Sequence, residues 1–212
     1  MTTQGAQIDS LLGGVPIVPV VVIDDAAQAL PLVDALAAGG ITAIEVTLRT
    51  PAALAVVQAI AEARPNVIVG TGTVLSEKDL DASIEAGAKF AVSPGLTEAL
   101  AHAAQKSNEA CPLLPGVATA SEAMRASEYG FERLKFFPAG QAGGVPYLKS
   151  LSGPLPHLKF CPTGGVTPAT LPDYAALENT FTAGGSWIAP GALIAAEDWS
   201  AIEERAAAVT CS

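Results

Sequence analysis

Short apolar or β-branched runs recur along the chain at a nearly constant interval, and each is followed by a stretch with helical periodicity. Successive runs begin 20 to 26 residues apart, about the length that a strand, a loop and a short helix need together. The pattern therefore predicts eight βα units, with strands beginning near Ile17, Ile41, Val67, Lys89, Pro112, Glu132, Leu158 and Phe181.

Three of the helical stretches have clear end signals. Glycine just past the last turn and proline in the first turn are common at helix ends, and a serine before acidic residues is typical of an N-cap. Gly39 and Gly40 end the first stretch, Pro51 opens the second, and Ser76 precedes the third. These signals predict helices over residues 26–38, 51–63 and 76–86.

Strands that alternate with helices favour a parallel sheet, and eight right-handed crossovers close most naturally into a barrel. We therefore expect an α/β fold, a single (β/α)₈ TIM barrel, with an open doubly wound sheet as the alternative. Residues 1–14 are expected to form a short helix that caps the bottom of the barrel, and residues 15–212 the catalytic barrel domain.

Composition and charge exclude several classes of protein. Half of the 212 residues are hydrophobic and 15% are charged, which is typical of a compact globular protein. A net charge of −10 repels polyanions and excludes nucleic acid as a partner. The longest apolar stretch, residues 11–23, is shorter than the ~20 residues of a membrane span. A signal peptide begins with a positively charged region, but the first cation of this chain is Arg49. We expect a cytoplasmic protein with no membrane partner.

The cysteines and histidines do not have the spacing of a metal site. Cys111, Cys161 and Cys211 are about fifty residues apart, which is compatible with reduced structural thiols rather than a disulfide framework. His102 and His157 fall on a predicted helix and in a proline-rich loop, so we expect no metal. Gly-Thr-Gly-Thr at 70–73 does not complete a dinucleotide fingerprint.

Two Gly-Gly pairs follow the last two predicted strands, where the loops of many barrels bind phosphate. They are Gly164–Gly165 and Gly184–Gly185, with Thr163 and Ser186 beside them. Glycine lets backbone N–H groups approach a phosphate closely, so an acidic protein can bind an anion by local geometry. Glycines that only turn the chain are the alternative for either pair alone.

Three of the six lysines fall in predicted strands, and Lys135 is the one near a strand's upper end. Lys89 and Lys159 are expected near the bottom of the barrel. A lysine at its ordinary pKa of ~10.4 is almost fully protonated at pH 7, so a nucleophilic lysine needs a dry setting or a neighbouring cation. Leu134 and Phe136 offer Lys135 such a setting, although a lysine that snorkels along an apolar wall fits the same residues.

Glu45 lies near the end of an otherwise apolar strand, where alternation turns it toward the interior. A carboxylate there is costly unless it has a partner or carries protons. Arg49, four residues later, is a candidate partner for Glu45 or for a substrate carboxylate. The residues alone leave a structural ion pair and a catalytic acid equally open.

Six motifs occur in order: EVTLR (45–49), GTGTVL (70–75), SPGLTE (93–98), LKFFPA (134–139), FCPTGGV (160–166) and GGSW (184–187). Together they resemble the 2-keto-3-deoxy-6-phosphogluconate (KDPG) aldolase family. The resemblance implies a class I, metal-free, pyruvate-dependent lyase without a cofactor, on a (β/α)₈ barrel that is usually a trimer. Pyruvate and glyceraldehyde 3-phosphate would be the small-molecule partners, and 4-hydroxy-2-oxoglutarate fits the same imine chemistry.

Residue roles follow from the resemblance, motif by motif. Lys135 would form the Schiff base, and Glu45 would be the general acid and base. Arg49 and Thr73 would hold the pyruvate carboxylate. The remaining contacts would be Pro94, Phe137 and Thr163 around the substrate, and Gly164, Gly165, Gly185 and Ser186 around the phosphate.

Thr71 and Gln141–Ala142 are the places where the chain fits the family pattern less well. Two other classes of protein remain as alternatives. A sugar-phosphate epimerase or isomerase on a barrel would share both Gly-Gly loops but would have no use for Lys135. A non-catalytic barrel that binds a phosphorylated metabolite would show saturable binding without turnover.

Overall fold

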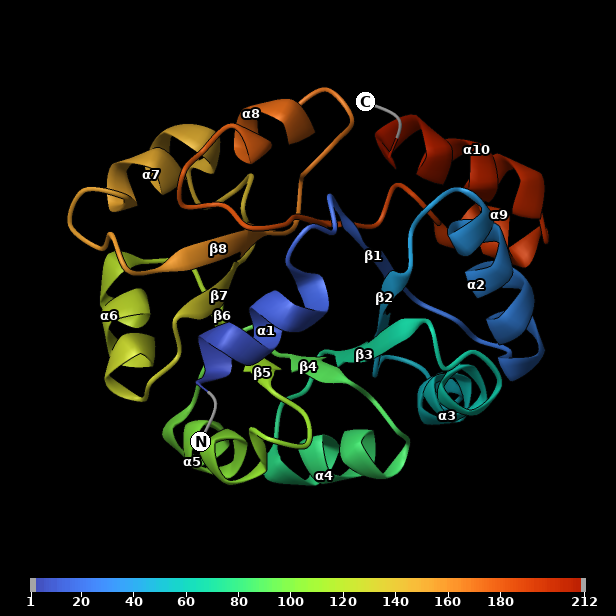
Figure 1. Cartoon of the computed structure of the whole chain (residues 1–212), viewed down its shortest axis with the longest axis horizontal. Coiled ribbons are helices and arrows are strands. Elements are labelled where there is room, and N and C mark those ends of the chain that lie inside the picture. Colours follow the sequence, from blue (N-terminus) through green and yellow to red (C-terminus); the bar gives the residue numbers. More distant parts are fainter. Residues whose placement is uncertain (1–2, 211–212) are drawn as a thin grey trace.

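The computed structural model describes residues 3–210, in which short parallel strands alternate with helices (Figure 1). The strands are β1 (Val18–Val21), β2 (Ala43–Thr47), β3 (Ile68–Gly72), β4 (Phe90–Val92), β5 (Leu113–Leu114), β6 (Gly116–Val117), β7 (Arg133–Phe136), β8 (Lys159–Pro162) and β9 (Gly184–Gly185). The helices are α1 (Gln4–Leu12), the 3-10 turn η1 (Ala26–Gln28), α2 (Ala29–Ala38), α3 (Ala53–Ala63), α4 (Glu77–Glu85), α5 (Glu98–Ser107), α6 (Ala120–Glu128), α7 (Gly144–Leu151), α8 (Leu171–Ala175), α9 (Gly191–Ala195) and α10 (Trp199–Thr210).

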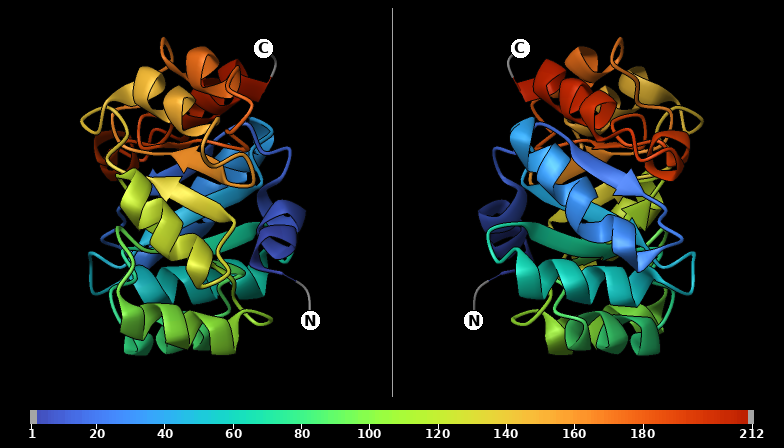
Figure 2. Two further views of the ribbon diagram at one scale, coloured as in Figure 1. Left: turned by 90° about the vertical axis from the view of Figure 1, so that its left-hand side faces the viewer. Right: turned by 90° about the vertical axis from the view of Figure 1, so that its right-hand side faces the viewer.

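The strands form two parallel sheets around one interior, with the helices outside them (Figures 1 and 2). The six-stranded sheet has the order β5-β4-β3-β2-β1-β9, and the three-stranded sheet has the order β6-β7-β8. Because every pairing is parallel, the carboxyl ends of all strands lie at the same end of the molecule.

The expectation of a closed eight-stranded (β/α)₈ barrel is wrong, because the hydrogen-bonded ladder is broken in two places. Pro115 divides the fifth predicted strand into β5 and β6, and proline has no N–H to donate to a ladder. Between β8 and the last strand there are only the isolated bridges Phe160↔Thr180 and Thr163↔Gly184. The chain therefore has a half-barrel sheet and a separate small sheet.

The predicted element positions agree closely with the structure. Each apolar run contains or adjoins a strand, and the fifth contains two. The helix predicted over 26–38 begins as η1 and continues as α2, and the one predicted over 51–63 begins as α3 at Ala53. The Ser76 side chain accepts a hydrogen bond from the Asp79 N–H at 3.2 Å, which makes Ser76 the N-cap of α4.

Buried side chains form two apolar clusters. The larger cluster contains strand residues such as Val46 together with residues of the outer helices such as Val57 and Ile60. The smaller one fills the interior at the amino ends of the strands, where Ile8 and Leu12 of α1 are fully buried with Phe90 and Cys161. Burying each large side chain of this kind contributes about 1.5–3 kcal/mol.

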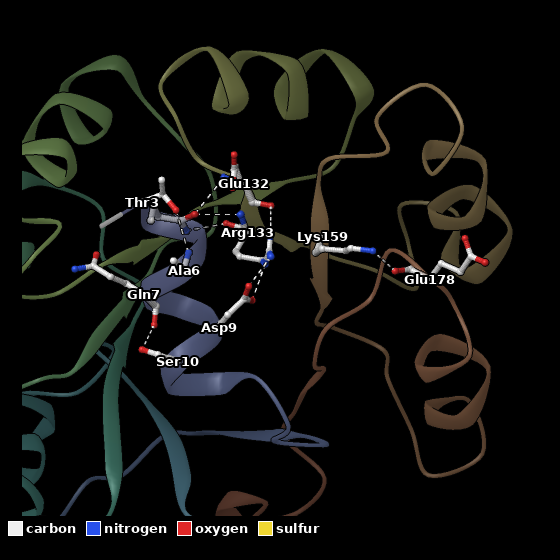
Figure 3. Close-up of polar contacts among 10 residues, drawn as sticks. Thr3, Ala6, Gln7, Asp9, Ser10, Glu132, Arg133, Lys159 and Glu178 are labelled. Atoms are coloured by element: carbon white, nitrogen blue, oxygen red, sulfur yellow. Dashed lines mark hydrogen bonds and ion pairs between the residues drawn. The ribbon is translucent and has the colours of Figure 1, made fainter. Parts of the chain in front are cut away.

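Helix α1 lies across this end of the interior and is fastened there by polar contacts (Figure 3). The Gln4 amide donates to the carbonyls of Leu113 and Arg133, and Asp9 binds the Arg133 guanidinium through both oxygens. Residues 1 and 2 of the predicted capping segment lie outside the described residues, and the division of the chain after residue 14 stays a prediction. With this end closed, the opposite end is left for a site. Within residues 3–210, no helix is long and apolar enough to cross a membrane.

Candidate active site

Lys135 lies in the interior of the fold, on the third residue of β7. It is 6% exposed, and it is the one lysine of the six whose side chain is buried. Its neighbours in register are Gly116 on β6 and Cys161 on β8. The side chain does not run along a wall to solvent, so the snorkelling alternative is wrong. Lys159 lies at the other end of its strand and donates to the carbonyl of Glu178 (Figure 3).

Glu45 and Lys135 form a buried ion pair, with Glu45 Oε1 3.2 Å from Lys135 Nζ. The side chains of Lys135 and Glu45 are 7% and 5% exposed, so both charges depend on each other for compensation. Arg49, the candidate partner of Glu45 in the sequence, does not form an ion pair with it. Arg49 is exposed beyond the end of β2, and its side chain has no partner among the described residues. The carboxylate therefore faces the amine with which it could exchange protons.

Gly72, the last residue of β3, leaves the space that the Glu45 carboxylate occupies. A Cβ atom on Gly72 would lie 2.1 Å from Glu45 Oε1 and 2.8 Å from its Cδ and Cγ. No side chain fits there while Glu45 keeps its position. The absence of a side chain at position 72 therefore lets the Glu45 carboxylate lie against Lys135.

An apolar wall borders the lysine. The Phe137 ring centroid is 5.3 Å from Lys135 Nζ, and Phe137 and Pro94 both line a cavity of about 170 Å³. Two glycines pack closely against this wall. A Cβ atom on Gly116 would lie 2.3 Å from the Pro94 carbonyl, and a Cβ atom on Gly164 would lie 3.3 Å from the Phe137 ring. The structure thus brings Lys135, Phe137, Pro94 and Gly164 into one continuous region.

Thr163 follows β8 and is buried beside Cys161. Its hydroxyl donates to the Cys161 carbonyl at 3.3 Å and lies 3.7 Å from the Cys161 thiol. Burial raises the pKa of Cys161 to about 12, so the thiol is neutral at pH 7 and packs as a small apolar group in the smaller cluster, beside Thr163. Cys111 is also a free buried thiol, whereas Cys211 lies outside the described residues.

The two predicted phosphate loops lie at neighbouring strand ends. Gly164 and Gly165 have φ angles of 88° and 78°, a left-handed conformation that favours glycine. A Cβ on Gly184 would lie 2.4 Å from Thr163 Oγ1, which shows how tightly the two loops meet. No group in residues 3–210 accepts a hydrogen bond from the backbone N–H of Gly165 or Ser186. Such free donors are what an anion requires.

Thr73 has a φ of 60°, in the left-handed region that β-branched residues rarely adopt. Strain of this kind costs of order 1–3 kcal/mol and is concentrated at functional sites. It turns the chain directly after Gly72, at the end of β3. No hydrogen bond or ion pair among the described residues joins Thr73, Arg49 or Ser186 to Lys135, so their predicted roles stay predictions.

Sequence reasoning missed Gly72, Gly116 and Cys161. Gly72 and Cys161 lie inside the motifs GTGTVL and FCPTGGV, but Gly72 was given no role of its own and Cys161 was interpreted as a structural thiol. Their positions in the sequence could have indicated them, since all three fall near the ends of predicted strands that neighbour the strand of Glu45 or Lys135. Thr71 departs from the family pattern without reaching the site. Its hydroxyl points away from the interior and donates a hydrogen bond to Ser83 Oγ on α4.

The arrangement can form an imine with a ketone. A lysine amine in a dry interior supplies the nucleophile, and a carboxylate 3.2 Å away can carry the protons of dehydration. Over residues 3–210, no three His, Cys, Asp or Glu side chains gather as a candidate metal-binding group.

Comparisons with known proteins agree with this chemistry. The family described as KDPG and KHG aldolase matches residues 8–205. The 2-dehydro-3-deoxy-phosphogluconate aldolase of Pseudomonas aeruginosa is 47% identical over 93% of this chain and 89% of its own.

Two solved structures are similar over nearly the whole chain. KDPG aldolase from Legionella pneumophila, with pyruvate captured at low pH as a covalent carbinolamine, has a TM-score of 0.92 and 44% identity over 98% of both chains. The Zymomonas mobilis enzyme with 3-phosphoglycerate has a TM-score of 0.89 and 44% identity over 95% of this chain and 94% of its own. The chain therefore belongs to the KDPG and KHG aldolase family.

Proposed function

We propose that the protein cleaves 2-keto-3-deoxy-6-phosphogluconate to pyruvate and glyceraldehyde 3-phosphate through an imine on Lys135, and that it also accepts 4-hydroxy-2-oxoglutarate. The observation that carries this proposal is the buried Lys135–Glu45 pair at 3.2 Å. An isomerase or a non-catalytic phosphate-binding protein would have no use for a lysine in that position. Family membership supports the lyase over both alternatives.

Lys135 Nζ attacks the C2 carbonyl of the substrate, and Glu45 protonates the departing oxygen as water leaves and the imine forms. Glu45 then takes the proton of the C4 hydroxyl while the C3–C4 bond breaks. The electrons of that bond move into the protonated imine, which becomes an enamine, and the aldehyde departs. Protonation at C3 and hydrolysis release pyruvate and restore the amine.

The substrate's two charged ends would lie at different strand ends. Arg49 and Thr73 would hold the pyruvate carboxylate, since a guanidinium binds a carboxylate through two hydrogen bonds. Pro94, Phe137 and Thr163 would enclose the reacting carbons. Gly164, Gly165, Gly185 and Ser186 would bind the phosphate, and the unpaired N–H groups of Gly165 and Ser186 support this.

A direct assay tests the proposed activity. The purified protein is mixed with KDPG, and pyruvate and glyceraldehyde 3-phosphate are measured separately with coupling dehydrogenases. Equal amounts of both products are expected, at a rate that a metal chelator leaves unchanged. An isomerised six-carbon product, or binding without product, would reject the lyase.

Ser186→Ala is expected to lower kcat/KM for KDPG and to spare a substrate without phosphate. The change removes one hydrogen bond to a charged group, worth about 1.5–3 kcal/mol, so the loss should be roughly 10- to 150-fold. 4-Hydroxy-2-oxoglutarate should react at a nearly unchanged rate. Ser200→Ala, at an exposed serine of α10, is the control. Equal losses on both substrates would place the phosphate elsewhere.

Gly72→Ala is expected to lower kcat by roughly 10- to 100-fold, because the new Cβ displaces the Glu45 carboxylate from its position against Lys135. Borohydride should still trap pyruvate on this variant, since Lys135 is intact. Gly191→Ala is the matched control, because a Cβ at Gly191 meets no atom within 4 Å. Unchanged kcat in Gly72→Ala would mean that Glu45 works from another position.

The assembly and location are further parts of the proposal. A homotrimer is supported by the family resemblance, and the exposed side chains of Leu75 and Met124, at 60% and 54%, are available for a partner chain to cover. A phosphorylated sugar acid is too highly charged to cross a bilayer unaided, which supports work in the cytoplasm. Light scattering on the purified protein tests the trimer.

A further inference from the structure

The last helix of the chain reaches the loop that would hold the substrate phosphate. Helix α10 lies in the outer layer beside α2 and α9 (Figure 1). From there Arg205 Nη1 donates a hydrogen bond of 2.7 Å to the backbone carbonyl of Trp187. Trp187 directly follows Ser186, so this bond acts one residue away from the predicted phosphate ligand.

Few hydrogen bonds hold the backbone of segment 186–189, although the side chains of Ile188 and Ala189 are buried in the larger apolar cluster. Pairing of β9 with β1 ends at Gly185, opposite Pro19. Within the described part of the chain, residues 186–189 take part in no hydrogen bond besides the one from Arg205. Ser186 and Trp187, which precede these buried residues, have so few hydrogen bonds that they would lose conformational freedom on binding an anion, and that loss weakens binding.

Packing restrains the same loop on its other side. A Cβ on Gly185 would lie 2.6 Å from Ile17 Cδ1 and 3.0 Å from Trp187 Nε1, so the indole and Ile17 fit closely against the Gly185 backbone. Ser186 is exposed between these two restraints. Packing therefore restrains Gly185, and the hydrogen bond from Arg205 restrains the Trp187 carbonyl.

We propose that Arg205 is a positioning residue for the phosphate loop, residues 184–187, and acts through the Trp187 carbonyl to set the affinity for phosphorylated substrates. The proposal rests on the proposed function. Arg205 is exposed on the outer layer and does not touch the reacting atoms. Its effect is therefore on the phosphate end of the substrate and not on imine chemistry.

The surroundings of Arg205 indicate which substitution isolates the hydrogen bond. Its side chain lines an apolar groove between α8 and α10, together with Leu171, Trp187 and Val209. Arg205→Met keeps an unbranched apolar stem in that groove and removes only the guanidinium. Arg205→Lys keeps a charge and a shorter donor and serves as the conservative variant.

The test compares KDPG with 4-hydroxy-2-oxoglutarate for the full-length wild type, Arg205→Met and Arg205→Lys. In Arg205→Met, KM for KDPG is expected to rise about three- to tenfold, while kcat on KDPG and both constants on the unphosphorylated substrate change less than twofold. Arg205→Lys should recover part of the affinity. Arg64→Met is the control, because that guanidinium binds Asp34 on the molecule's surface.

Competition by inorganic phosphate gives a second readout of affinity at the phosphate loop. Its inhibition constant against KDPG should rise in Arg205→Met by the same factor as KM, and the melting temperature should stay near that of Arg64→Met. Equal losses on both substrates would make Arg205 a general structural residue, and unchanged constants would show that the loop is positioned without it; either result overturns the proposal. A wild type that cleaves neither substrate would instead refute the proposed function, and the inference with it.

Discussion

Lys135→Met is expected to abolish aldol cleavage, lowering kcat by at least about 10⁴-fold. Methionine replaces the apolar stem of lysine and is only one atom shorter, but it cannot form an imine, so the electrons of the breaking C–C bond have no acceptor. Pyruvate release from KDPG measures the loss. Lys159→Met is the matched control, because Lys159 also lies on a strand but contacts the Glu178 carbonyl at the other end of the molecule.

The same substitution leaves Glu45 buried without its partner, and breaking a buried ion pair costs about 3–5 kcal/mol of unfolding free energy. The double variant Lys135→Met/Glu45→Gln should recover much of that stability and none of the turnover. Urea unfolding of the single and double variants separates misfolding from lost chemistry. Appreciable turnover in a folded Lys135→Met protein would remove Lys135 from the mechanism.

Glu45→Gln is expected to lower kcat by roughly 10² to 10⁴-fold, the usual range for general acid–base catalysis. Glutamine keeps the shape of the side chain and one hydrogen-bond acceptor for Lys135, but it cannot take up or release a proton at pH 7. Dehydration to the imine and removal of the C4 hydroxyl proton should both slow down. Pyruvate affinity should change little, because the carboxylate of pyruvate is assigned to Arg49 and Thr73.

Steady-state kinetics in the cleavage direction, together with the pyruvate inhibition constant, measure these two effects separately. Glu98→Gln, which alters an exposed carboxylate in the first turn of α5, is the control. A kcat close to the wild-type value would reduce Glu45 to a structural partner of Lys135.

Much of the fold follows from local patterns along the chain. Apolar runs at intervals of 20 to 26 residues mark the strands, and end signals such as Ser76 mark the helices, because both depend on neighbours in sequence. Strand ends are also local, so Glu45 and Lys135 could be picked out as interior groups before the fold was known. The motif order then pointed to the family to which the chain belongs.

Features that depend on distant segments could not be predicted in this way. At Pro115 the chain passes from the sheet that contains β4 to the sheet that contains β7, and the sequence does not show which of these strands needs a hydrogen bond from that position. Arg49 was the obvious partner for Glu45 in sequence, but the partner in space is 90 residues away. Gly72 matters because the Glu45 side chain lies against its backbone, and no pattern in residues 70–73 predicts that contact.

Borohydride reduction in the presence of pyruvate shows whether Lys135 forms the imine. Reduction converts an imine into a stable secondary amine, and peptide mass spectrometry then locates the modified lysine. We predict one reduced pyruvate per chain, on the peptide that contains Lys135, and no labelling when either pyruvate or borohydride is left out. Labelling at Lys159 or Lys89, or no adduct in an enzyme that turns over KDPG, would contradict it.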